Sequence, residues 1–120
     1  MKIMIVDDHA DMRRTLHNYV ALSIKEPLEI FDYESGEQAL ENYKVHMPDF
    51  VLMDIELKTM SGFVVTEEIL KKNPQAKVVI ITSYDTPGFR SKAKRIGAIG
   101  FIAKDNLSKI QPFLNSQTNN

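Results

Sequence analysis

Residues that can do chemistry follow four short apolar runs of this 120-residue chain. They are Asp7 and Asp8 after residues 2–6, Asp54 after 50–53, Thr82 after 78–81 and Lys104 after 100–103. Two carboxylates about 4 Å apart repel by about 4 kcal/mol at an effective dielectric near 20, and a third adds to that repulsion. A lysine and a hard divalent cation such as Mg²⁺, which keeps waters for a phosphate, would offset the charge. A carboxylate, Mg²⁺, a lysine and a hydroxyl are the parts of a phosphoryl-transfer site.

The apolar runs themselves predict the strands of a parallel sheet. Residues 50–53 and 78–81 are apolar at every position, which is typical of central parallel strands that helices cover on both faces. Residues 28–33 alternate with acidic residues and predict an edge strand, and residues 2–6 and 100–103 complete a set of five. The carboxyl ends of parallel strands lie along one edge of a sheet. The residues that follow them are therefore expected to converge.

Helices are predicted between these strands. One begins at Asp8 or His9, the second follows a capping box of Ser35 with Gln38, and the others cover about 62–73, 87–96 and 105–114. The helix over 87–96 has a thin apolar stripe, so we expect it to be weakly anchored and mobile. Pro112 predicts a kink near Gln111 in the last helix, and residues 115–120 are expected to be a polar tail or the start of a linker.

Composition and length narrow the class of protein. One α/β domain over residues 1–120 with right-handed crossovers accounts for the alternation of strands and helices. A formal net charge of -1 and a pI near 6.3 argue against direct binding of nucleic acid. The chain has no cysteine, and its first apolar run is too short for a signal peptide or a membrane span. We therefore expect a soluble cytoplasmic protein that does not contact membranes.

From end to end, the chain resembles the receiver domain of bacterial two-component response regulators. The matching residues are Val6-Asp7-Asp8, Asp54 with Gly62 eight positions later, Thr82-Ser83, and Gly100-Phe101 followed by Lys104. The resemblance implies a flavodoxin-like (βα)5 fold, a doubly wound parallel sheet of five strands in the order 2-1-3-4-5. The run over residues 100–105 looks like the branch whose members carry a C-terminal helix-turn-helix DNA-binding domain, which this chain does not contain.

The resemblance also implies a phosphoacceptor and a metal site. Asp54 would take a phosphoryl group from the phosphohistidine of a sensor histidine kinase or a phosphotransfer protein. Asp8, Asp54 and the backbone carbonyl of Glu56 would ligate Mg²⁺, while Asp7 would hold the metal through water. Such a domain is a signalling switch rather than an enzyme, because it catalyses only its own phosphorylation and dephosphorylation.

A second set of matching residues would carry the signal outward. Lys104 would pair with the phosphoryl oxygens, the Thr82 hydroxyl would be drawn to them, and Phe101 would move into the space that Thr82 leaves. The face formed by the fourth helix, fifth strand and fifth helix would then change. That face would control a downstream effector, a DNA-binding domain or a phosphorylation-dependent homodimer.

Three features of the sequence adjust this expectation. Asp105 replaces the usual proline after the lysine, which leaves open whether the Lys104–Asp105 bond is cis or trans. Bulky Tyr84 and anionic Glu56 are expected to tune the lifetime of the acyl phosphate by obstructing or perturbing the attacking water. Arg90 and three neighbours, Lys92, Lys94 and Arg95, form a basic cluster that is either a solvated face or a dock for an acidic partner.

Alternative functions remain at this stage. The site could be kept in a degenerate receiver that acts as a phosphorylation-independent binding module. An aspartyl-nucleophile phosphohydrolase would want a second aspartate where this chain has Glu56. A nucleotide or flavin binder would need a phosphate cradle, but the loop over residues 7–10 is acidic and contains no glycine. The three histidines lack ligand spacing and are expected at the surface, with His9 placed where it could modulate the acidic pair.

Overall fold

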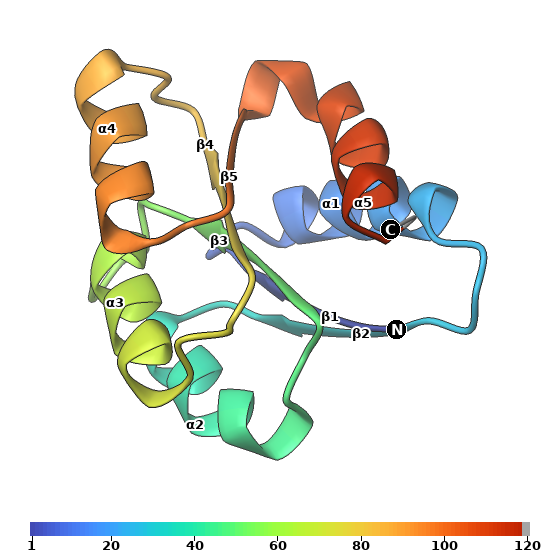
Figure 1. The fold of residues 1–120 in the computed structure, drawn as a ribbon, viewed down its shortest axis with the longest axis horizontal. Helices are drawn as coiled ribbons and strands as arrows, with labels where there is room; N and C mark the ends of the chain where they lie inside the picture. The colour runs from blue at the N-terminus through green and yellow to red at the C-terminus, as the bar shows by residue number, and fades with distance from the viewer. Residues whose placement is uncertain (119–120) are drawn as a thin grey trace.

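Five parallel strands form one sheet in the order β2-β1-β3-β4-β5, as the resemblance implied (Figure 1). The computed structural model describes residues 1–118. The strands are β1 (Lys2–Val6), β2 (Glu29–Tyr33), β3 (Phe50–Asp54), β4 (Val78–Thr82) and β5 (Gly100–Ala103). The α-helices are α1 (Ala10–Ser23), α2 (Gly36–His46), α3 (Gly62–Lys72), α4 (Pro87–Ile96) and α5 (Ile110–Thr118), and a 3₁₀ segment, η1 (Lys104–Lys109), precedes the last.

Burial along the strands explains their order in the sheet. Every residue of β3 and β4 is buried, whereas β2 and β5, at the two edges, are largely half-buried or exposed. This confirms the prediction that continuous apolar runs form the centre and that the alternating run forms an edge. Because Asp54 is paired with Ile81 and Thr82 with Ala103, the ends of β3, β4 and β5 lie level with one another.

The two faces of the sheet carry separate apolar layers. Helices α2, α3 and α4 cover one face, to which they contribute buried residues such as Tyr43, Phe63 and Ala93. Helices α1 and α5 cover the other face with residues such as Leu16 and Leu114 (Figure 1). The anchoring of α4 is thin, as predicted, because Ala93 is its only buried residue. The mobility of α4 stays a prediction.

Three helices begin close to their predicted positions, and side-chain caps begin two of them, α2 and α4. The Ser35 side chain accepts a hydrogen bond from the Gln38 N–H at 3.2 Å, and the Gln38 side chain accepts one from the Glu34 N–H, also at 3.2 Å. Thr86 caps α4, with Pro87 in its first turn. Helix α1 begins at Ala10 with His9 as its N-cap, one residue later than the nearer predicted start.

The C-terminal segment corrects two predictions. The helix does not begin near residue 105, and the break does not fall near Gln111. The non-helical residue is Asn106 (φ -140°, ψ 45°), and α5 begins only at Ile110. Pro112 therefore lies in the first turn of α5, where the missing N–H has no helical partner to lose. Helix α5 continues to Thr118, so residues 115–118 are helical rather than a tail, and 119–120 lie outside the described residues.

Candidate functional site

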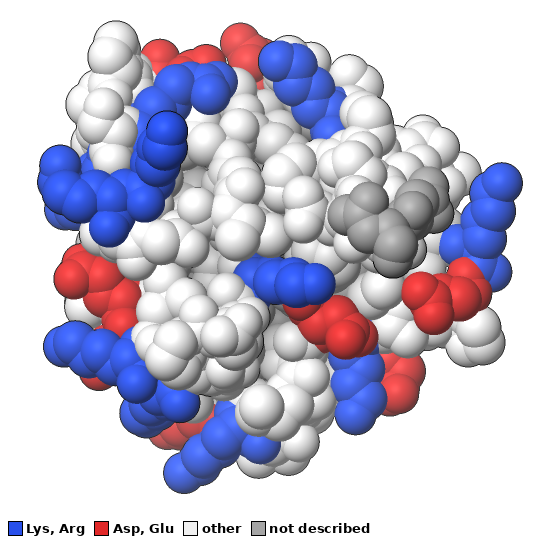
Figure 2. All heavy atoms as spheres, in the orientation of Figure 1, with Lys and Arg blue, Asp and Glu red and all other residues white. Residues whose placement is uncertain are grey.

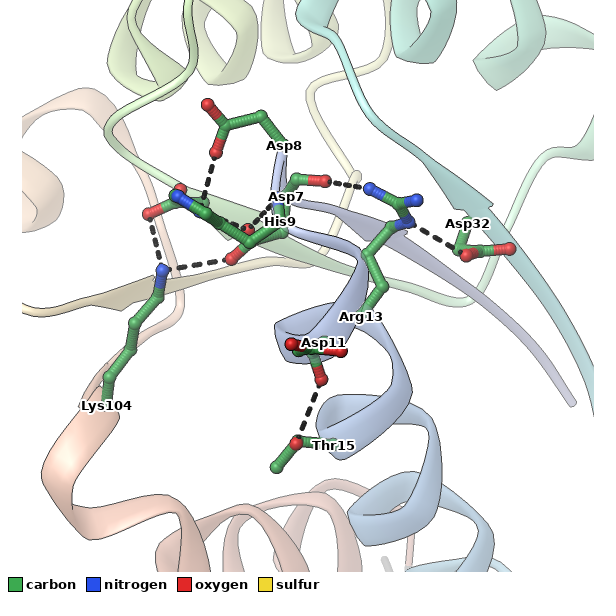
Figure 3. A network of polar contacts seen from close by, with 9 residues as sticks. Asp7, Asp8, His9, Asp11, Arg13, Thr15, Asp32 and Lys104 are labelled. Atoms are coloured by element: carbon green, nitrogen blue, oxygen red, sulfur yellow. Dashed lines mark hydrogen bonds and ion pairs between the residues drawn. The ribbon is translucent and has the colours of Figure 1, made fainter.

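Two buried carboxylates share one lysine at the carboxyl edge of the sheet. Asp7 follows β1, Asp54 ends β3 and Lys104 follows β5, so the fold brings them together from distant parts of the sequence. The Lys104 Nζ atom lies 2.9 Å from Asp7 Oδ2 and 3.3 Å from Asp54 Oδ1 (Figure 3). The relative exposure of Asp7 is 0% and that of Asp54 is 3%. The predicted convergence of these three residues is therefore confirmed.

Burial sets the protonation behaviour of this group. Desolvation and, to a lesser extent, the charge of Asp7 raise the pKa of Asp54 to about 6, although Lys104 and the Glu56 N–H act to lower it. Burial works to lower the pKa of Lys104, but its hydrogen bond with Asp7 and the charges of Asp54 and Asp7 outweigh that effect and raise it. The lysine is therefore firmly charged, and the carboxylate of Asp54 is held at an electrostatic cost.

The residues of this edge fit a divalent cation with oxygen ligands. Asp7, Asp8 and Asp54 bring three carboxylates, and Lys104 Nζ forms ion pairs with two of them, Asp7 and Asp54. Asp54 Oδ2 is buried and has no hydrogen-bond or ion-pair partner among the described residues. Leaving such an oxygen unpaired is costly. A hard cation such as Mg²⁺, which takes oxygen ligands and keeps several waters, matches this donor set.

His9 contacts both members of the acidic pair. Its Nδ1 atom lies 2.9 Å from Asp8 Oδ1 and 3.4 Å from Asp7 Oδ1, and its backbone N–H donates to Asp7 Oδ1 at 2.8 Å (Figure 3). The histidine side chain is 72% exposed, whereas the Asp8 side chain is 9% exposed. The surface position expected for His9 is confirmed, and the double contact adds to it.

Arg13, which no pattern in the sequence indicated, supports the same loop. Its Nη1 atom donates to the backbone carbonyl of Asp7 at 2.8 Å, and its Nε atom lies 3.0 Å from Asp32 Oδ2 on β2 (Figure 3). Only 17% of the Arg13 side chain is exposed. The spacing from Asp7 to Arg13 gave no signal, because this contact depends on where α1 crosses the end of β1.

Thr82 and its neighbours lie at the end of β4. Thr82 is fully buried, and its Oγ1 atom accepts a hydrogen bond from the Tyr84 N–H at 3.0 Å. The threonine O–H is therefore still able to donate to another group. Tyr84 is 51% exposed, which places its ring at the surface beside the site.

Phe101 is half-buried on β5, under the side chain of Arg90. The Arg90 guanidinium carbon lies 4.7 Å from the centre of the Phe101 ring, a cation–π contact. Asp85 accepts two hydrogen bonds from the same guanidinium, one of them at 2.9 Å. The loop before α4 is thus connected through Arg90 to Phe101. This connection was not predicted, because it joins residues five and eleven positions apart on different elements.

Two further predicted positions follow Asp54. The Glu56 side chain is exposed, in the loop after β3. At Gly62 a Cβ atom would lie 1.9 Å from the backbone oxygen of Asp54, so only glycine allows α3 to begin so close to the strand.

The peptide bonds of the described residues are all trans, and these include the bond between Lys104 and Asp105.

The sheet order and the acidic edge first define a class, the flavodoxin-like α/β domains. Comparison with known proteins then narrows the class. A family model for the response regulator receiver domain matches residues 3–112. The chain is 35% identical over 104 residues to the chemotaxis protein CheY of Bacillus subtilis, a match that covers 86% of this chain and 84% of that protein. The chain belongs to the response regulator receiver domain family.

Other relatives are longer than the matched region, so this chain spans about half of their length. The oxygen regulatory protein NreC of Staphylococcus carnosus is 33% identical over 107 residues, which are 88% of this chain and 48% of NreC. The chain likewise spans 44% of the transcriptional regulatory protein DegU of Brevibacillus brevis. A LuxR-family DNA-binding response regulator from Staphylococcus aureus superposes with a TM-score of 0.85 at 26% identity, over 96% of both chains. Among residues 1–118, none of the helices has the length and apolar character to cross a membrane.

Proposed function

We propose that the chain is a phosphoacceptor switch of a two-component system and that Asp54 receives the phosphoryl group. The observation that carries this proposal is the buried Asp54 carboxylate: one of its oxygens contacts Lys104, and the other has no hydrogen-bond partner among residues 1–118. In the reaction, an Asp54 oxygen forms a bond to phosphorus while the bond from phosphorus to the donor imidazole nitrogen breaks. The donor is the phosphohistidine of a sensor kinase or a phosphotransfer protein.

The surrounding residues prepare Asp54 for this step. Asp8, Asp54 and the backbone carbonyl of Glu56 would hold Mg²⁺, with Asp7 acting through a water. When bound, Mg²⁺ supplies the positive charge that three carboxylates and a phosphoryl group require. Lys104, which lies 3.3 Å from Asp54 Oδ1, keeps its ammonium where the phosphoryl oxygens would arrive. Catalysis then consists of positioning and charge neutralisation.

Thr82 and Phe101 would transmit the change. The Thr82 hydroxyl, which already accepts from Tyr84, would donate to a phosphoryl oxygen and move toward it. Phe101 would then turn inward into the space that Thr82 leaves. Because Phe101 has no hydroxyl, its two positions differ only in packing and in the contact with Arg90.

The output surface is proposed to be the face of α4, β5 and α5. A hollow of about 380 Å³ lies between α4 and β5, lined by residues that include Arg90, Lys94, Ile99 and Phe101. Lysine and arginine side chains gather over α4 (Figure 2). An effector with acidic residues, or a second copy of this domain, would fit such a surface. Residues 1–120 are proposed to form a single domain that works in the cytoplasm.

Tyr84 and Glu56 are proposed to set how long the signal lasts. The half-exposed Tyr84 ring and the exposed Glu56 side chain follow Thr82 and Asp54 at the same spacing of two residues. Tyr84 would obstruct the water that attacks the acyl phosphate in line, and Glu56 would perturb it.

Intact-mass measurement with acetyl phosphate tests the proposal. We expect a gain of one phosphoryl group that requires both Mg²⁺ and Asp54, with Asp54→Asn as the control that gains none. A folded protein that gains no phosphoryl group under any condition would instead be a degenerate receiver, which signals by binding alone. Steady release of phosphate from small phosphate esters would point to a phosphohydrolase.

A further inference from the structure

The Arg13 guanidinium bridges the ends of two strands beside the acidic pair. Its Nη1 atom donates to the backbone carbonyl of Asp7 at 2.8 Å, and its Nε atom donates to Asp32 Oδ2, on β2, at 3.0 Å (Figure 3). Only 17% of the Arg13 side chain is exposed, whereas the side chain of Arg14, the next residue of α1, is 71% exposed. The N–H donors of a guanidinium lie in one plane, so they hold two acceptors at a fixed spacing.

The carbonyl that Arg13 contacts belongs to the peptide unit that leads into Asp8. The carbonyl of Asp7 and the N–H of Asp8 lie in the same rigid plane. On the other side of its Cα atom, the Asp7 N–H donates to the Tyr33 carbonyl at 3.1 Å and continues the pairing of β1 with β2. The direction in which Asp8 leaves the backbone therefore depends on the bond that holds the Asp7 carbonyl.

The charge of Arg13 and its position should act on a nearby cation in opposite directions. A guanidinium repels Mg²⁺, so its charge alone weakens binding of the metal. Among residues 1–118, none of the hydrogen bonds or ion pairs of Arg13 reaches a carboxylate oxygen of Asp7 or Asp8. Lys104, in contrast, pairs directly with an Asp7 carboxylate oxygen. Arg13 thus fixes the backbone of the acidic pair without occupying its carboxylates.

We propose that Arg13 is a positioning residue for the Mg²⁺ site, which orients the peptide between Asp7 and Asp8 and so presents the Asp8 carboxylate to the ion. This inference rests on the proposed function, in which Asp8 is a ligand of Mg²⁺. Asp32 completes the arrangement, because it fixes the second edge of the guanidinium. Without Arg13 the ion itself would have to order the peptide, and that cost would lower its affinity.

Mg²⁺ titration of the full chain, followed by ¹H–¹⁵N NMR, tests the positioning role. Arg13→Gln is expected to weaken Mg²⁺ binding about tenfold, the lower end of the effect of residues that orient metal ligands. Arg14→Gln removes the same charge from the adjacent, exposed position and should change the affinity less than about twofold. Unchanged or tighter Mg²⁺ binding by Arg13→Gln would overturn the proposal, because loss of a positive charge by itself favours the cation.

Arg13→Lys separates geometry from charge. Lysine keeps the charge but cannot hold two acceptors in one plane, so this variant should still bind Mg²⁺ at least about threefold more weakly than wild type. Wild-type affinity in Arg13→Lys would mean that charge alone matters and would overturn the proposal.

The metal-free protein gives a readout that needs no Mg²⁺. In EDTA, the three-bond coupling constant between the amide and α protons of Asp8 reports the φ angle of that residue. Arg13→Gln should shift this coupling constant, and Arg14→Gln should leave it as in wild type. An unchanged coupling constant in Arg13→Gln would overturn the positioning role even if Mg²⁺ binding weakened.

Phosphorylation by acetyl phosphate separates this inference from the proposed function. Arg13→Gln should need about tenfold more Mg²⁺ for half of the maximal rate of mass gain, and saturating Mg²⁺ should restore the wild-type rate. If wild-type protein binds Mg²⁺ but gains no phosphoryl group, the proposed function fails, while weaker Mg²⁺ binding by Arg13→Gln still supports the positioning role. If wild type is phosphorylated and Arg13→Gln binds Mg²⁺ equally well, the positioning role fails and the proposed function stands.

Discussion

Replacing Asp54 by asparagine should stabilise the metal-free protein at neutral pH. Burial and the charge of Asp7 hold the pKa of Asp54 at about 6, above its ordinary value of 3.8. A carboxyl whose pKa is higher in the folded than in the unfolded chain binds its proton more tightly when folded. The free energy of unfolding therefore falls as pH rises from about 4 to about 6 and stays at the lower level above that. Asparagine has no proton to release, so the Asp54→Asn variant does not lose this free energy of unfolding as pH rises.

The magnitude follows from the two pKa values. One pKa unit corresponds to about 1.4 kcal/mol, so the rise from 3.8 to about 6 costs about 3 kcal/mol once Asp54 is ionised. Asp54→Asn should thus be more stable than wild type by about 3 kcal/mol at pH 7.5. At pH 4.5, where the folded carboxyl is protonated, the advantage should shrink to about 1 kcal/mol.

Urea unfolding in EDTA at the two pH values measures this difference. With a denaturant dependence of about 1–3 kcal/mol per molar, the midpoint should rise by about 1–3 M at pH 7.5. Asp105→Asn, which removes an exposed aspartate just after Lys104, is the matched control and should change little. Mg²⁺ should narrow the gap by stabilising wild type. A variant no more stable than wild type at pH 7.5 would refute the claim that Asp54 is ionised at an electrostatic cost.

Four other substitutions address separate parts of the structure. Lys104→Ala should abolish phosphorylation by acetyl phosphate. It should also lower the free energy of unfolding by about 3 kcal/mol, since two buried carboxylates lose their partner. Unchanged urea unfolding would contradict the loss of stability. Tyr84→Ala should speed loss of the phosphoryl mass, and an unchanged rate would remove the steric role. Arg90→Ala removes a cation–π contact with Phe101 that is worth about 0.5–1 kcal/mol. ¹⁹F NMR of fluorinated Phe101 should then show a second ring position. A single unshifted signal would argue against the contact. Gly62→Ala should lower the free energy of unfolding measured in urea by about 2 kcal/mol or more, because the alanine Cβ would collide with the Asp54 backbone. Unchanged stability would mean that α3 shifts freely.

The sheet and the main site residues could be predicted because their signals are local and redundant. Apolar runs such as residues 50–53 define central strands, and the residues that end parallel strands must meet at one edge. The convergence of Asp7, Asp54 and Lys104 needs no knowledge of side-chain packing, since topology alone brings these residues together.

The remaining contacts depend on how packed elements lie against one another. Arg13 reaches the Asp7 carbonyl because α1 crosses the end of β1 at a particular place, and Arg90 reaches Phe101 because α4 lies beside β5. The C-terminal break was misplaced for a different reason. Pro112 was taken as the cause of a kink, but the backbone at Asn106 leaves the helical region earlier, so the proline falls where a helix tolerates it.

The close approach of Gly62 to Asp54 makes the two helices beside the site unequally anchored. Helix α3 touches the backbone of Asp54 through Gly62 and buries five of its residues, so shifting it would disrupt both the strand and the core. Helix α4 buries only Ala93 and is connected to the end of β4 through Asp85. If Asp54 is disturbed, we therefore expect α4 to move more readily than α3. This unequal anchoring would direct a signal from Asp54 toward α4 before any partner binds.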